Sequence, residues 1–162
     1  MGVLYGYYSA ADDKDAARAV VREFRELCEY RGPRELREAD GDGRDEHVTQ
    51  GIDPVVELLP AEVLITGRAP EDVRSDPRRG ALVGVAGEGR VVAVSLTDSF
   101  RDALAAFDAD LLDDVAMGWS RTSGGLHGVH GPDVLGLFLK ELAGLAGRAA
   151  AGGRRLYCWI RP

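Results

Sequence analysis

The hydrophobic pattern is clearest near the C-terminus, where apolar residues recur every three or four positions. This spacing predicts one buried face of a helix that begins at Pro132 and Asp133 and ends at Gly152 and Gly153. The predicted buried positions are Leu135, Phe138, Leu139, Leu142, Leu145, Ala146 and Ala149. Beyond the glycines, the segment 156–160 alternates with apolar residues on both faces, which predicts a strand inside a sheet.

The N-terminal third predicts a strand, a helix and then a polar loop. Val3–Tyr8 is rich in residues that favour strands, and Asp12 or Asp13 can cap the helix that follows. The predicted buried stripe of this helix is Ala17, Val20, Val21, Phe24, Leu27 and Cys28. Arg34–Gln50 has almost no apolar residues, so we expect a mobile loop there.

The middle of the chain predicts short helices around a hairpin. A helical region from Ile52 to Gly67 is expected to be divided by Pro60. Ala81–Val85 and Val91–Leu96 are predicted strands joined by a glycine-rich turn. Thr97, Asp98 or Ser99 can cap the next helix, a further helical turn contains Leu111, Leu112 and Val115, and a glycine-rich loop spans Trp119–Gly131.

These elements predict an α+β fold in a single domain over residues 1–162. We expect about four strands with helices packed on one face, closed by a long helix and an apolar C-terminal strand. A chain of this length buries about two-thirds of its unfolded surface, which is enough for one core.

Three short motifs carry a family resemblance. They are Met1-Gly2-Val3-Leu4 leading to Tyr7, Leu64-Ile65-Thr66-Gly67 at a helix end, and Leu96-Thr97-Asp98 at a helix start. With the closing helix and strand, they resemble the YfbM-like family of small bacterial proteins of unknown function. The resemblance implies the same α+β architecture and brings no established activity.

Composition narrows the function classes. The net charge of −7 argues against general nucleic-acid binding, which requires a basic surface. No apolar run approaches the roughly 20 residues that span a bilayer, and the N-terminus lacks the pattern of a signal peptide. Cys28 and Cys158 lie in apolar patterns and are expected to be buried free thiols. We therefore expect a cytoplasmic protein, with its oligomeric state left open.

Two histidines in the glycine-rich loop, His127 and His130, are the candidate metal ligands. Zinc requires further ligands that converge on the same point, and the glycines around this pair disfavour a helix that would place both rings on one face. We expect no metal and no cofactor.

The entrance to the same loop offers a candidate anion site. Trp119, Ser120, Arg121 and Thr122 combine an aromatic ring, two hydroxyls and a guanidinium, which suits a carboxylate or phosphate. The alternative is that a buried tryptophan anchors the loop and Arg121 pairs with a nearby acid. The acidic residues Asp108, Asp110, Asp113 and Asp114 are interpreted as helix caps and a solvated face.

Two functions follow from these features. The leading hypothesis is a non-catalytic binding protein that contacts a protein partner through an acidic surface, in an immunity- or antitoxin-like role. The alternative is a small-molecule-binding domain or small enzyme that uses the Trp119–Gly131 loop, with Trp119, Ser120, Arg121, Thr122, His127 and His130 as ligand-binding residues. No catalytic residue is predicted.

Overall fold

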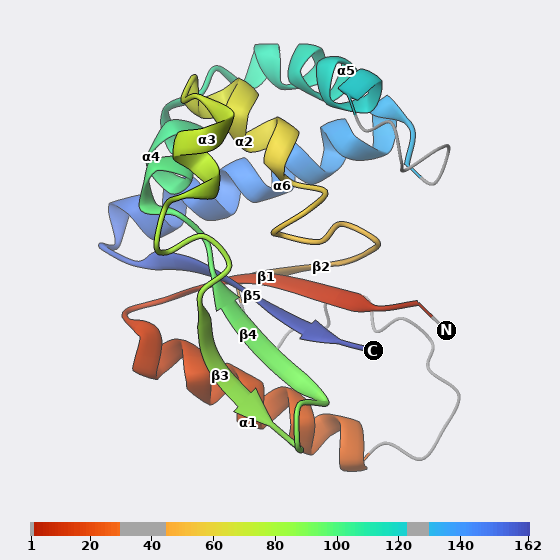
Figure 1. The fold of residues 1–162 in the computed structure, drawn as a ribbon, viewed down its shortest axis with the longest axis vertical. Coiled ribbons are helices and arrows are strands. Elements are labelled where there is room, and N and C mark those ends of the chain that lie inside the picture. Colours follow the sequence, from red (N-terminus) through yellow and green to blue (C-terminus); the bar gives the residue numbers. More distant parts are fainter. Residues whose placement is uncertain (1, 30–44, 123–129) are drawn as a thin grey trace.

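The computed structural model describes residues 2–29, 45–122 and 130–162. Five strands form one antiparallel sheet in the order β2-β1-β5-β4-β3 (Figure 1). Their bounds are β1 Leu4–Ala10, β2 Glu46–Gln50, β3 Leu82–Ala86, β4 Val91–Ser95 and β5 Arg155–Arg161. The α+β class is therefore confirmed, and the predicted C-terminal strand is the central one.

Helices cover both faces of the sheet, so the prediction of helices on a single face is wrong. Helix α1 (Asp13–Glu29) lies on one face, and the remaining helices lie on the other (Figure 1). These are α2 Leu59–Thr66, α3 Pro70–Arg74, α4 Asp98–Ala106, α5 Leu112–Thr122 and α6 Pro132–Ala151, with a 3₁₀ turn, η1, at Ala109–Leu111. The reason is that β5 is apolar on both sides: Tyr157 and Trp159 pack toward α1, whereas Leu156 and Cys158 pack toward α6.

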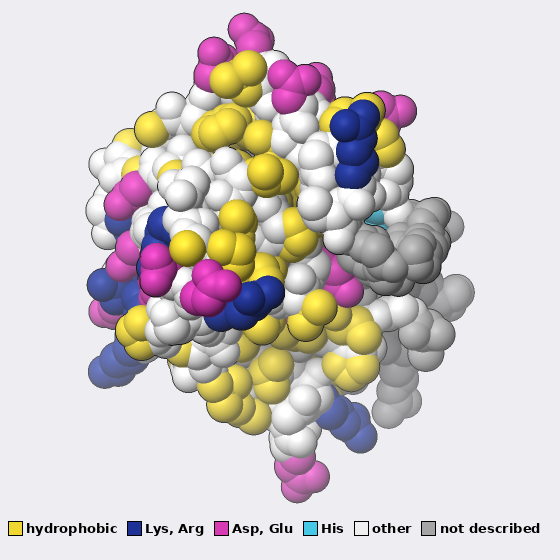
Figure 2. All heavy atoms as spheres, turned by 45° about the horizontal axis from the view of Figure 1, so that its top comes forward, with side chains coloured by type: hydrophobic (Ala, Val, Ile, Leu, Met, Phe, Trp, Pro, Cys, Tyr) yellow, Lys and Arg dark blue, Asp and Glu magenta, His cyan; other side chains and the backbone are white. Residues whose placement is uncertain are grey.

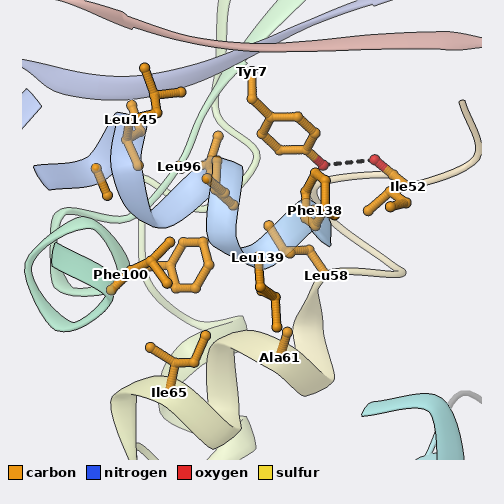
Figure 3. Packing of buried hydrophobic residues seen from close by; sticks show 14 of the residues in the cluster. Tyr7, Ile52, Leu58, Ala61, Ile65, Leu96, Phe100, Phe138, Leu139 and Leu145 are labelled. Atoms are coloured by element: carbon orange, nitrogen blue, oxygen red, sulfur yellow. Dashed lines mark hydrogen bonds between the residues drawn. The ribbon is translucent and has the colours of Figure 1, made fainter. Parts of the chain in front are cut away.

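Helix α6 organises the larger core, and its predicted buried stripe is confirmed residue by residue. The helix packs against α4, α5 and the sheet. The ring of Phe138 lies 5.2 Å from that of Tyr7 in an edge-to-face pair, and the Tyr7 hydroxyl donates to the carbonyl of Ile52 at 2.7 Å (Figure 3). This hydrogen bond satisfies the one polar atom of a tyrosine that is otherwise sealed in the core.

Local signals for helix ends were also correct. The Thr97 side chain accepts a hydrogen bond from the amide of Phe100, which caps α4. Gly67 follows α2 in the left-handed conformation, with φ of 68°, where glycine costs no steric strain. Pro60 lies in the first turn of α2, so it starts this helix after a non-helical turn.

The buried face of α1 differs from its predicted stripe. Ala16, Ala19, Val20 and Glu23 are buried, whereas Val21 is 51% exposed. Glu23 faces inward because Arg161 of β5 is buried beside it, with a nitrogen–oxygen separation of 3.7 Å. A buried guanidinium requires a nearby carboxylate, so Glu23 shares the buried face of α1 with the predicted Val20, and the predicted Phe24 and Leu27 pack partly buried against the same core.

The cysteines and the polar loop need two further corrections. Both thiols are free, but only Cys158 is buried, because Cys28 lies exposed near the end of α1. Most of the predicted loop lies outside the described residues, and its last five residues form the edge strand β2 instead. The β-branched Val48 and Thr49 favour a strand once β1 is present to pair with them.

Leu142→Ala tests the core around α6. Leu142 is 0% exposed, so its truncation is expected to lower the free energy of unfolding by about 2–5 kcal/mol through lost burial and a residual cavity. Leu137→Ala on the same helix is the control, because Leu137 is 65% exposed. Urea denaturation of both variants checks this, and equal midpoints would contradict the assigned face of α6.

Gly6→Ala tests the contact between β1 and β5. Gly6 is paired with Trp159, and a Cβ at position 6 would lie 1.9 Å from Cε2 of that indole. We expect destabilisation by about 1–3 kcal/mol or more from overpacking. In Gly2→Ala the nearest atom is 4.0 Å away, so this variant should match the wild type in thermal denaturation. A stable Gly6→Ala protein would show that the ring can move aside.

Candidate functional site

The residues predicted to form an anion site lie at the end of α5 and not in a loop. Trp119 is 1% exposed, and its indole nitrogen donates to the carbonyl of Glu57 at 2.9 Å. The Ser120 hydroxyl donates to the carbonyl of Met117 at 2.8 Å, and the Thr122 hydroxyl donates to that of Trp119 at 3.0 Å. Both hydroxyls are thus bonded within their own helix, and the tryptophan anchors α5 to the segment before α2.

Arg121 and His130 differ in their surroundings. Arg121 is exposed at the end of α5. His130 is partly buried, and its Nε2 atom is buried with no hydrogen-bond partner among the described residues. This atom would lie 2.9 Å from a Cβ at Gly51. His127 lies outside the described residues, so the predicted pair is not described together.

Trp119 and His130 therefore both contact the segment 51–57. Its two acids bond to its own backbone: Asp53 Oδ1 accepts from the amides of Val55 and Val56 at 2.7 and 2.8 Å, and Glu57 Oε2 accepts from the amide of Asp53 at 2.6 Å. Burial raises the pKa of the Glu57 carboxyl, and the negative charge of Asp53 adds to this. The only sequence signal for this arrangement is Asp-Pro at 53–54, which is typical of turns.

The raised pKa of Glu57 predicts a pH dependence of stability. A carboxyl whose pKa is higher in the folded state binds its proton more tightly there, so its contribution falls as pH rises. The stability of wild type relative to Glu57→Gln should therefore decrease as pH rises from the ordinary value of 4.5 through the raised pKa. Urea denaturation over this range measures the difference. Glu71→Gln, at an exposed position of α3, is the control, and a difference for Glu57→Gln that does not change with pH would contradict the raised pKa.

A second acidic residue, Glu62 of α2, is sealed inside the protein. It is 3% exposed and accepts from the Thr97 hydroxyl at 2.5 Å and from Arg79 Nε at 3.4 Å. Burial raises the pKa of its carboxyl. Because solvent and substrates do not reach it, Glu62 joins α2 to the start of α4 and does not form a site.

The four aspartates near the start of α5 are exposed, as expected for caps and a solvated face. Asp108 Oδ1 accepts from the amide of Asp110 at 3.0 Å and caps η1. Asp113 pairs with Lys140 of α6, with 3.1 Å between Nζ and Oδ1. Asp110 and Asp114 add two further exposed carboxylates to the same short stretch.

Large apolar side chains are exposed beside these aspartates. Leu111 is 48% exposed and Met117 is 43% exposed, and Leu64 of α2, at 46%, reaches to 3.3 Å from a Cβ at Gly118. Leu137, at 65%, lies on α6 one turn from Lys140, the partner of Asp113. We call these four apolar residues and the four aspartates the α5 face. Figure 2 shows hydrophobic side chains across this side of the molecule, with acidic side chains at its upper edge.

Within the ranges 2–29, 45–122 and 130–162, no three His, Cys, Asp or Glu side chains are grouped so that they could hold a metal ion. In the same ranges, no helix has both the length and the apolar character needed to cross a membrane.

No family model, curated protein or solved structure matches the chain. The resemblance to the YfbM-like family therefore stays a prediction.

Proposed function

We propose that this protein is a non-catalytic binding protein that recognises a protein partner through the α5 face. The observation that carries this proposal is the exposure of Leu64, Leu111, Met117 and Leu137 beside a group of exposed aspartates. Apolar side chains gathered on one surface are typical of interaction sites, especially when polar groups surround them. An immunity- or antitoxin-like role is one form of such binding.

The charges on the α5 face define the partner. Asp113 is already paired with Lys140, whereas Asp108, Asp110 and Asp114 present further carboxylates near Leu111. A complementary surface has lysine or arginine residues around an apolar centre. The ionic contacts speed association and select the partner, and the apolar contacts supply most of the affinity.

The alternative function, ligand binding or catalysis at Trp119–Gly131, has less support. The indole nitrogen of Trp119 and the hydroxyls of Ser120 and Thr122 bond to backbone carbonyls. Asp53 and Glu57, the acids of the segment that Trp119 contacts, accept hydrogen bonds from the turn before α2. These groups hold the fold together, and a ligand would have to displace those bonds to use them.

Site-specific photo-crosslinking tests the proposal. A photoreactive amino acid at position 117 of the α5 face is expected to give a discrete adduct with one protein in the cells that produce this chain. The same amino acid at position 21 is the matched control, because Val21 is also on a helix and is 51% exposed. Charge reversal by Asp110→Lys with Asp114→Lys should abolish the adduct, and added salt should weaken it.

Two results would contradict this function. Adducts of the same pattern from positions 117 and 21 would indicate non-specific collision. An adduct at position 117 that survives the double charge reversal would show that the aspartates take no part in recognition.

A further inference from the structure

A cavity of about 460 Å³ opens at the edge of the sheet, away from the residues of the α5 face. It lies where β1 continues past β2: Ser9 and Ala10 pair with β5, whereas the pairing with β2 ends at Tyr8 and Glu46. Helix α1, the start of β2 and the end of α6 supply the rest of its wall. Its volume is within the range of small-molecule sites, about 300–1,000 Å³.

Arginines dominate the lining of this cavity. Arg18 and Arg22 come from α1, Arg148 from α6, and Arg154 from the residue before β5. The acids of the lining are Asp15, Asp45 and Glu46. Four positive and three negative side chains leave a formal charge of +1, in a chain whose net charge is −7. Among the described residues, the lining is therefore slightly positive in formal charge, although the protein as a whole is acidic.

Existing contacts hold two of the guanidinium groups in place. Arg148 makes a two-point contact with Asp45, at 2.8 Å from Nε and 2.7 Å from an Nη atom. Arg154 donates to the Ser9 hydroxyl at 3.2 Å and to the Ser9 carbonyl at 3.1 Å. Side chains that are fixed before a ligand arrives lose less entropy when it binds.

The other two guanidinium groups are less fully engaged. Arg18 lies 3.6 Å from Asp15, a separation longer than a hydrogen bond. Arg22 Nε is buried and has no hydrogen-bond partner among the described residues. A buried donor without a partner costs free energy, and an anion in this cavity would remove part of that cost.

We propose that this cavity binds a small organic anion through a carboxylate or phosphate group. Guanidinium groups recognise both by paired, charge-assisted hydrogen bonds. The three acids of the lining disfavour a polyanion such as nucleic acid and provide acceptors for hydroxyl or amino groups elsewhere on the ligand. The site is separate from the α5 face, so each can be tested without the other.

Calorimetric titration of the full chain with inorganic phosphate and with citrate, at constant ionic strength, tests the site. We expect saturable binding of at least one of the two, and the one that binds identifies the anionic group. Arg22→Gln and Arg148→Gln should each weaken that binding by about tenfold or more, because each removes a charge-assisted contact. Arg148 is 60% exposed, so this variant is expected to fold even if Arg22→Gln does not.

Arg25→Gln is the matched control, because Arg25 is exposed on α1 and does not line the cavity. It should bind the anion as the wild type does. Three results would overturn the proposal: no saturable binding of either anion, unchanged affinity in both cavity variants, or an equal loss in Arg25→Gln. The first would show that the internal ion pairs already neutralise the cavity, and the last would show a general effect of net charge.

Discussion

The structure depends on the burial of β5 from both sides. Tyr157 and Trp159 are almost fully buried on the α1 side, and Leu156 and Cys158 are buried on the α6 side. A strand with two apolar faces is stable only if both are covered, so the chain must place α1 on one side and the other helices on the opposite side. Gly6 allows β1 to pair beside the indole of Trp159. Side chains of β5 belong to both hydrophobic cores, so displacement of this strand would expose both cores.

The sequence predicted the elements whose signals are local. The stripe of α6, the Thr97 cap and the Gly67 stop each depend on residues within a few positions of each other, and each was correct. The alternation in β5 also indicated two apolar faces, and the second of these is the face that α1 covers. The missed features depend on residues distant in sequence. Glu23 turns inward because of Arg161, and β2 forms because β1 offers it an edge.

The candidate sites also combine local features that the sequence indicates with contacts between distant residues that it does not. Trp119 was recognised as a possible buried anchor, but its acceptor, the carbonyl of Glu57, lies 62 residues away and no pattern indicates it. The arginines of the cavity come from α1, α6 and the residue before β5. Their spacing in the sequence does not indicate that they are close in space. They meet only because the order of the strands brings α1, α6 and the start of β5 to the same edge of the sheet. By contrast, the aspartates of the α5 face lie within seven residues of each other, from 108 to 114, and this local cluster correctly indicated an exposed acidic surface.

The pairing of β1 with β5 also constrains how the protein is made. β1 leaves the ribosome well before its partner, because Leu4–Ala10 pairs with Arg155–Arg161. Until residue 161 has emerged, the nascent chain can form the β3–β4 hairpin and individual helices, while Tyr7 and Tyr8 remain without the strand that buries them. Contacts between distant segments form slowly, and exposed strands are prone to aggregation before they pair. For this fold, the interval between translation of β1 and translation of β5 is therefore the period in which a chaperone would have the greatest effect on yield.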